Sequence, residues 1–211
     1  MLEVFPFYQG FAVGLGLIIA IGAQNAFVIK QGLLKNQVFI IALICALIDA
    51  ILIIVGVTGL GAIISSTPIL LGVAKYGGVV FLLCYAAMSF RKAFKSDILY
   101  VSNDDAKISF KQAVITTLAV SLLNPHLYID TCLLIGSIGS NFKGSDRFDF
   151  ASGAILASFI WFFTISYGAR LLIPIFQQPI SWKILDFIIG IIMCGIAASL
   201  MMWDLKYVAP I

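Results

Sequence analysis

Two acidic side chains, Asp49 and Asp130, lie in the middle of long apolar stretches of this chain. A carboxylate at bilayer depth costs about 2.5–3.5 kcal/mol on insertion scales, and such residues normally face the bundle interior or a water-filled cavity. We therefore expect both acids to be functional, as ligands of a cation or a proton. The alternative is structural, with Asp49 hydrogen-bonded to a neighbouring span or paired with Lys75 or Arg170.

Polar residues also interrupt two of the apolar stretches. Residues Gly22–Asn25 break the first stretch, and residues Leu123–His126 break the fourth. Hydrocarbon contains no water to satisfy a backbone freed from its helix, so a break at that depth persists only where it is buried in protein or lines a cavity. One such break in each half of a short membrane protein indicates a solute pathway.

The second break has a specific mechanism. Pro125 lacks an N–H and pushes the preceding residue out of the α region, but it suits the first position of a helix. The helix should therefore stop at Leu123 and restart at Pro125, with Asn124 as the N-cap. The positive end of the restarted helix would face the break and attract an anionic group, such as the carboxylate of an amino acid.

Side chains around the breaks suit a zwitterion with an extra positive charge. His126 and Asp130 are four residues apart and share one helical face. His126 could carry a proton, or it could be a core histidine beside Tyr128. The predicted substrate-binding residues are Gln24, Asn25, Asp49, Asn124, His126 and Asp130, and the predicted helix-break residues are Gly22 and Pro125.

Composition gives the class of protein that must position these residues. Hydrophobic residues make up 62% of the chain and charged residues 11%, with a mean hydropathy of +1.10, far from the values of a soluble domain. We expect an all-α integral membrane protein with one transmembrane transporter domain over residues 1–211. Each predicted span is near the ~20 residues that cross ~30 Å of hydrocarbon. The six spans cover about 5–29, 38–60, 68–90, 113–138, 150–173 and 184–203.

The two breaks also suggest a duplication. Asn25 and Asn124 lie 99 residues apart, close to half of the chain. Three spans in each repeat would force the halves into opposite orientations, which is the inverted-repeat plan of many secondary transporters. The predicted fold is thus a three-plus-three inverted repeat with broken helices one and four. The duplication is imperfect, because the first acid falls in span two and the second in span four.

The basic residues predict the orientation. Of the thirteen Lys and Arg residues, nine fall on the side that includes the loop over residues 91–112. The positive-inside rule places that loop in the cytoplasm and both termini outside. The net charge of +3 is therefore an orientation signal, and we expect no nucleic-acid partner.

Glu3 is the only charge before Lys30, so the first span lacks the basic region of a signal peptide.

Other classes of function have little support. The cysteines are isolated, with no C-x-x-C, and are expected to be small packing residues and not a redox pair. A single histidine disfavours a structural zinc site, and no nucleophile–base set indicates an enzyme. We expect no metal and no cofactor. The four cysteines are Cys45, Cys84, Cys132 and Cys194.

Glycine recurs along the predicted spans, for example at Gly56 and Gly136. Small residues at such positions let helix backbones approach closely. We expect most of them to serve helix packing. Glycine-rich faces would also permit a homodimer.

Three segments of the chain resemble the lysine/arginine exporter family, in its LysE/ArgO branch. They are Gly22–Val28, the mid-span Asp49, and Asn124–Asp130. The resemblance extends in order over essentially the whole chain, including Gln31-Gly32 and Ala157–Phe159 with Trp161. The sister branch that exports neutral amino acids has a Gly-Pro version of the first motif and a different residue after Asn-Pro.

The resemblance implies a multi-pass carrier of the bacterial inner (plasma) membrane. It would export L-arginine, L-lysine or analogues from the cytoplasm, driven by membrane potential or a proton gradient, with a coupling proton as partner. The half-helix ends would hold the substrate carboxylate, Asp49 or Asp130 would hold the side-chain cation, and the remaining acid with His126 would titrate. The alternatives are export of neutral amino acids or of metal ions.

Overall fold

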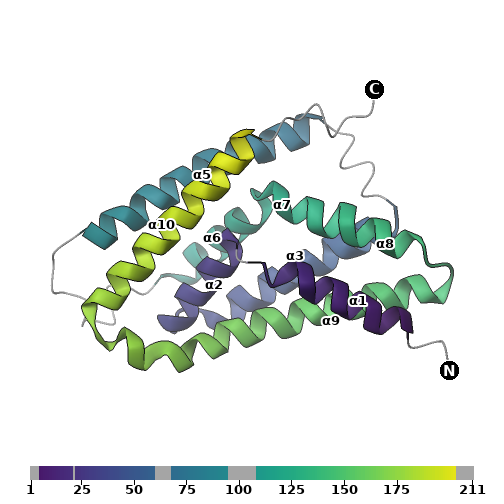
Figure 1. The fold of residues 1–211 in the computed structure, drawn as a ribbon, viewed down its shortest axis with the longest axis horizontal. Helices are drawn as coiled ribbons and strands as arrows, with labels where there is room; N and C mark the ends of the chain where they lie inside the picture. The colour runs from purple at the N-terminus through teal and green to yellow at the C-terminus, as the bar shows by residue number, and fades with distance from the viewer. Residues whose placement is uncertain (1–4, 21, 60–67, 95–107, 203–211) are drawn as a thin grey trace.

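The computed structural model describes residues 5–20, 22–59, 68–94 and 108–202, and every element within these ranges is helical. Figure 1 shows the helices as a bundle in which α5 and α10 form a pair along one side. The elements that form the two predicted breaks meet in the other part of the bundle, so the description begins with them.

The first predicted span consists of two helices. Helix α1 covers Phe5–Ile18 and helix α2 covers Ala23–Leu33, and the two are bent by 82° at the break between them. The break lies slightly earlier than we predicted, so Gln24 and Asn25 belong to the first turn of α2. Gly22 precedes that turn in an extended conformation, with φ −125° and ψ −176°.

The fourth predicted span is also interrupted; its restart was predicted, but the π-helical turn that follows was not. Helix α6 covers Phe110–Leu122 and α7 restarts at Pro125, as the missing N–H of proline predicts. The chain continues from α7 (Pro125–Tyr128) into a π-helical segment, η1 (Ile129–Ile135), and then into α8 (Gly136–Ser140). A π-helical turn is rare and is often found at functional sites.

The remaining elements are long helices. They are α3 (Val38–Val57), α5 (Pro68–Phe94), α9 (Ser145–Gly168), the 3₁₀ segment η2 (Ala169–Gln177) and α10 (Pro179–Met202). The predicted loop over 91–112 begins too early, because α5 continues through Arg91 and Lys92. Residues 95–107 of that loop lie outside the described residues.

Four described helices are long and apolar enough to cross a membrane. They lie within Val38–Val57, Tyr76–Phe94, Ser145–Phe176 and Ile180–Met202, and the bent pair α1–α2 could form a fifth span. The segment from α6 to α8 is built from shorter apolar helices. The all-helical membrane fold is therefore as predicted, whereas the count of six spans stays a prediction.

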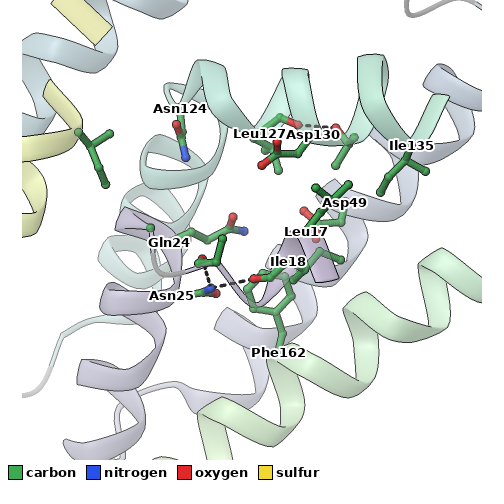
Figure 2. Close-up of a pocket in the computed structure, with 14 residues that line it drawn as sticks. Leu17, Ile18, Gln24, Asn25, Asp49, Asn124, Leu127, Asp130, Ile135 and Phe162 are labelled. Atoms are coloured by element: carbon green, nitrogen blue, oxygen red, sulfur yellow. Dashed lines mark hydrogen bonds between the residues drawn. The ribbon is translucent and has the colours of Figure 1, made fainter. Parts of the chain in front are cut away.

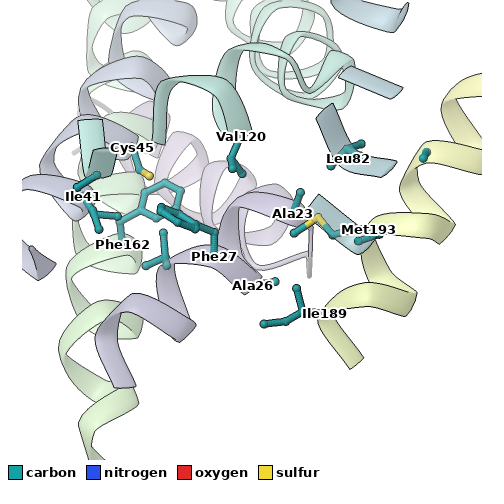
Figure 3. Close-up of a cluster of buried hydrophobic side chains, with 14 of the residues drawn as sticks. Ala23, Ala26, Phe27, Ile41, Cys45, Leu82, Val120, Phe162, Ile189 and Met193 are labelled. Carbon is teal, nitrogen blue, oxygen red and sulfur yellow. The ribbon is translucent and has the colours of Figure 1, made fainter. Parts of the chain in front are cut away.

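The largest apolar core joins α2, α3, α5, α6, α9 and α10. Figure 3 shows Phe27 of α2 and Phe162 of α9 at its centre, with Ile189 and Met193 of α10 facing α2. Large apolar side chains also cover the outside of the bundle, including Ile51, which is 60% exposed. Contiguous apolar surface of this kind is expected where a protein faces lipid.

Candidate functional site

A cavity of about 240 Å³ lies where the two helix breaks meet. It is smaller than the ~300–1,000 Å³ typical of drug-sized ligands, so it fits a small solute. Five of the six predicted substrate-binding residues line it, and Figure 2 shows them approaching the same space from α2, α3, η1 and the second break. These residues are Gln24, Asn25, Asp49, Asn124 and Asp130.

Asp49 lies on α3, is 1% exposed and is hydrogen-bonded by another helix. The Ser158 hydroxyl, on α9, donates to Asp49 Oδ2 at 2.8 Å. Among the described residues, Asp49 Oδ1 has no hydrogen-bond partner. One oxygen of the carboxylate is thus held by protein, while the other remains available to a cation.

Of the two predicted basic partners of Asp49, only Arg170 has a described side chain, and it does not pair with the acid. Arg170 is exposed, and its guanidinium lies 4.8 Å from the centre of the Tyr167 ring. The side chain of Lys75 lies outside the described side chains.

Asp130 supplies the second carboxylate of the cavity. It lies in η1, next to the buried Thr131, whose hydroxyl donates to the Leu127 carbonyl at 2.6 Å. Asp130 and Asp49 line the same cavity. Two neighbouring carboxylates repel each other, and a cation bound between them relieves that repulsion.

Gln24 adds a hydrogen-bond donor. Its side chain is buried on the first turn of α2, and its Nε2 has no partner among the described residues. A buried amide group without a partner costs about 1–3 kcal/mol, which a bound solute would remove. The cavity therefore combines an available donor with an available carboxylate oxygen.

Asn25 holds the first break together. Its Nδ2 donates to the carbonyls of Ile18 and Ala20, each at 2.9 Å, and its Oδ1 accepts from Trp161 Nε1 at 3.3 Å. Both protons of the amide are thereby used. Direct contact with a substrate, as predicted, would have to use the second lone pair of Oδ1, since both Nδ2 protons are already bonded.

The second break is arranged largely as expected. Asn124 precedes α7 and lines the cavity, and its carbonyl accepts from the Leu127 N–H at 3.1 Å. His126 lies in α7, but its side chain and that of Pro125 are outside the described side chains. The predicted contact between His126 and Asp130 therefore stays a prediction. Asp130 lies in the π-helical turn, so the rule that residues four apart share one face of an α-helix does not apply directly to this pair.

Sequence reasoning missed a buried ion pair. Lys30, which we expected in a loop, lies within α2 and donates to Asp186 Oδ1 on α10. Asp186 falls inside the predicted span 184–203. The argument that a carboxylate is costly in hydrocarbon, which we applied to Asp49, would therefore have identified Asp186 as well. Ser158 was also missed as a partner of Asp49, because a serine in an apolar span has no distinctive signal.

Known proteins resemble this chain over most of its length. Residues 15–203 match the family described as LysE type translocator. The chain is 40% identical to the arginine exporter protein ArgO of Pectobacterium carotovorum subsp. carotovorum, over 92% of this chain and 95% of that protein. It is 41% identical to the putative amino-acid transporter YggA of Aeromonas salmonicida, over 91% and 93% of the two chains. No solved structure matches it significantly.

Matches of this length include both helix breaks, both cavity acids and every described helix that is able to cross a bilayer. The resemblance therefore concerns the whole architecture and not one motif. This multi-pass protein of the bacterial inner membrane belongs to the LysE type translocator family.

Proposed function

We propose that this protein exports basic amino acids, L-arginine and also L-lysine or their analogues, from the cytoplasm. The observation that carries the proposal is the cavity at the helix breaks, where Asp49, Asp130 and Gln24 converge. A basic amino acid has two cationic groups and one carboxylate, which complements two acids and an amide donor. The arginine exporters among its relatives support the same substrate class.

The roles in the cavity follow from the available atoms. One of the two acids, through Asp49 Oδ1 or the Asp130 carboxylate, binds the guanidinium or ε-ammonium group of the substrate. Gln24 Nε2 donates to the substrate carboxylate, aided by the positive end of α2, which begins beside the cavity. Asn25 keeps that helix end in place through its bonds to Ile18 and Ala20.

The packing supports a three-plus-three inverted repeat of six spans within one transporter domain. Helix α1 packs along α9, and in the other half the segment from α6 to α8 packs along α3. The third helix of each half, α5 and α10, pair with each other. We infer alternating access around the cavity between the two broken helices, in which the α5–α10 pair moves as one unit against the remaining helices.

Energy for export comes from a coupled proton in this proposal. An inside-negative potential opposes the exit of a cation by about 2.3 kcal/mol per charge per 100 mV. Exchange of one proton for one cationic amino acid removes that opposition, because no net charge crosses. One cavity acid and His126 would carry the proton.

The test is efflux of labelled arginine and lysine from energised cells loaded with dipeptides, with and without the protein. Asp49→Asn and Asp130→Asn should each abolish the additional efflux while the protein stays in the membrane. Asp146→Asn, an exposed acid at the start of α9, is the matched control and should export normally. Normal arginine efflux from both cavity variants would refute the assignment of the acids.

The same cells separate the alternatives. Efflux of a labelled neutral amino acid such as leucine, without efflux of arginine, would move the substrate to the neutral class. A metal-ion cargo has less support, because no three His, Cys, Asp or Glu side chains in the described part of the chain form a group able to hold a metal.

A further inference from the structure

The buried ion pair between Lys30 and Asp186 joins two parts of the molecule. Lys30 is on α2, which lines the cavity, whereas Asp186 is on α10, which pairs with α5. Their side chains are only 8% and 2% exposed. Removing two charges from water often costs more than their attraction returns, so a pair of apolar residues would usually hold two helices equally well. Stability alone therefore does not explain why these two helices carry a buried ion pair.

The pair lies away from the cavity, toward one end of the bundle. Lys30 follows Asn25, a cavity residue on α2, by five residues, about 7–8 Å along the helix. Asp186 precedes Ile196, a cavity residue on α10, by ten residues, about 15 Å of helix. The C-terminal end of α5 is beside it, since Phe94 contacts Phe187. Positive charge predicts that this end faces the cytoplasm.

Between the pair and the cavity the helices are closed by apolar packing. Phe27 of α2 and the α10 side chains Ile189 and Met193 belong to the largest core cluster and are at most 2% exposed (Figure 3). A solute that enters from the cytoplasmic end between these two helices can reach the cavity only if α10 moves away from α2. That movement separates Lys30 from Asp186.

We propose that Asp186 is a second cation site, which Lys30 occupies while the cytoplasmic route is closed and which the substrate's guanidinium or ammonium group occupies as it enters. This inference rests on the proposed function. Once Lys30 has left, Asp186 is a carboxylate at membrane depth that requires a new cation. A guanidinium can bind a carboxylate through two parallel hydrogen bonds, so arginine competes well with the single ammonium of Lys30. Basic substrates would thus favour opening of their own route.

Cross-linking tests whether the pair must separate. In a background with the four native cysteines replaced by serine, a short bis-methanethiosulfonate reagent should link Lys30→Cys to Asp186→Cys and stop arginine export, and a reductant should restore it. The control uses the same reagent to join α5 to α10 through Phe90→Cys and Phe187→Cys, whose native rings have centroids 5.7 Å apart. That cross-link should leave export intact, because these helices move together. Full export by the cross-linked 30–186 variant would overturn the proposal.

A neutral pair tests the cation site itself, including the case in which the reduced cysteine variant does not export. Lys30→Gln with Asp186→Asn removes both buried charges and should remain in the membrane. We expect the KM for arginine on the cytoplasmic side to rise at least about tenfold, the equivalent of one charged hydrogen bond, with little change in the maximal rate. An unchanged KM would exclude a substrate contact at Asp186.

The outcomes are distinguishable from failure of the proposed function. If the unmodified protein exports no basic amino acid, the proposed function fails first. If it does, and Asp49→Asn stops export while both 30–186 variants behave like the unmodified protein, only the second cation site is refuted. Lys35→Gln, which removes an exposed cation at the same end of the bundle, should affect neither measurement.

Discussion

The Asp49 carboxylate shows how one hydroxyl can prepare a binding site. Ser158 is fully buried and donates to Oδ2 at 2.8 Å, which leaves Oδ1 without a described partner. A hydrogen bond to a charged group contributes about 1.5–3 kcal/mol. Ser158 is therefore a positioning residue, since it fixes the carboxylate that we assign to the substrate cation.

Ser158→Ala should weaken substrate binding more than it slows transport. Without the hydroxyl, the carboxylate can rotate away from the orientation that presents Oδ1 to the cavity, so the KM for arginine should rise by up to about tenfold while the maximal rate falls little. Efflux measured over a range of internal arginine concentrations gives both values.

The same helix supplies the control for that prediction. Ser166 is also buried on α9, but its hydroxyl has no partner within the described residues. Ser166→Ala removes an unsatisfied polar group, which is neutral or stabilising, and should leave the KM unchanged. Equal KM values for Ser158→Ala and the unmodified protein would show that Ser158 does not position the acid.

At the scale of elements, the close approach of α3 to the segment η1–α8 holds the two cavity acids together. A Cβ on Gly56 would lie 2.7 Å from the Thr131 carbonyl oxygen, and a Cβ on Gly136 would lie 2.8 Å from the Gly56 carbonyl. Only glycine permits this spacing, because the contacting atoms are backbone and cannot move aside. Asp49 lies on α3 and Asp130 on η1, so this contact sets their separation.

Gly56→Ala should therefore destabilise the protein by about 1–3 kcal/mol, the usual cost of overpacking. It should also reduce arginine export, because the acids move apart. Thermal unfolding in detergent and efflux in cells measure the two effects. Gly16→Ala and Gly195→Ala are controls, since a Cβ at either position meets nothing within 4 Å. A normal unfolding temperature for Gly56→Ala would show that α3 and η1 can separate without loss.

At the scale of the whole molecule, the Lys and Arg residues near the helix ends predict which side of the membrane each end faces. Lys111 lies on the first turn of α6, whereas Lys143 lies just before α9 and Arg147 in its first turn. The predicted orientation places Lys111 on the cytoplasmic side, with Lys30 and Arg91, and the other two residues outside. Six spans in the predicted orientation require the chain to cross the bilayer between Lys111 and Lys143, through the broken segment from α6 to α8. The side of the membrane on which each of these two residues lies therefore tests the predicted orientation, and also whether the fourth span crosses the bilayer.

Single cysteines at these two positions make that test. In a background without the native cysteines, Lys143→Cys should react with a membrane-impermeant maleimide added to intact cells. Lys111→Cys should react only after the membrane is permeabilised. Both native side chains are exposed, so burial does not explain a difference. Labelling of both from outside would mean that the segment from α6 to α8 does not cross.

The sequence predicts the membrane class, the positions of the long helices and the residues of the cavity well. Apolar length, the missing N–H of Pro125 and the cost of Asp49 in hydrocarbon are local properties that any arrangement of the helices must satisfy. They place the second break correctly, and five of the six predicted binding residues line one cavity. The exact limits of α1 and the π-helical turn depend on neighbouring helices and were not predicted.

What only the tertiary structure decided is which polar atoms are already paired. Gln24 and Asn25 are adjacent amides, yet Asn25 bonds Ile18, Ala20 and Trp161, while the Gln24 Nε2 has no described partner. Lys30 and Asp186 likewise meet across 156 residues. Sequence determines where polar groups occur and that hydrocarbon forbids leaving them unsatisfied. Which group satisfies which depends on the packing of helices that are distant along the chain.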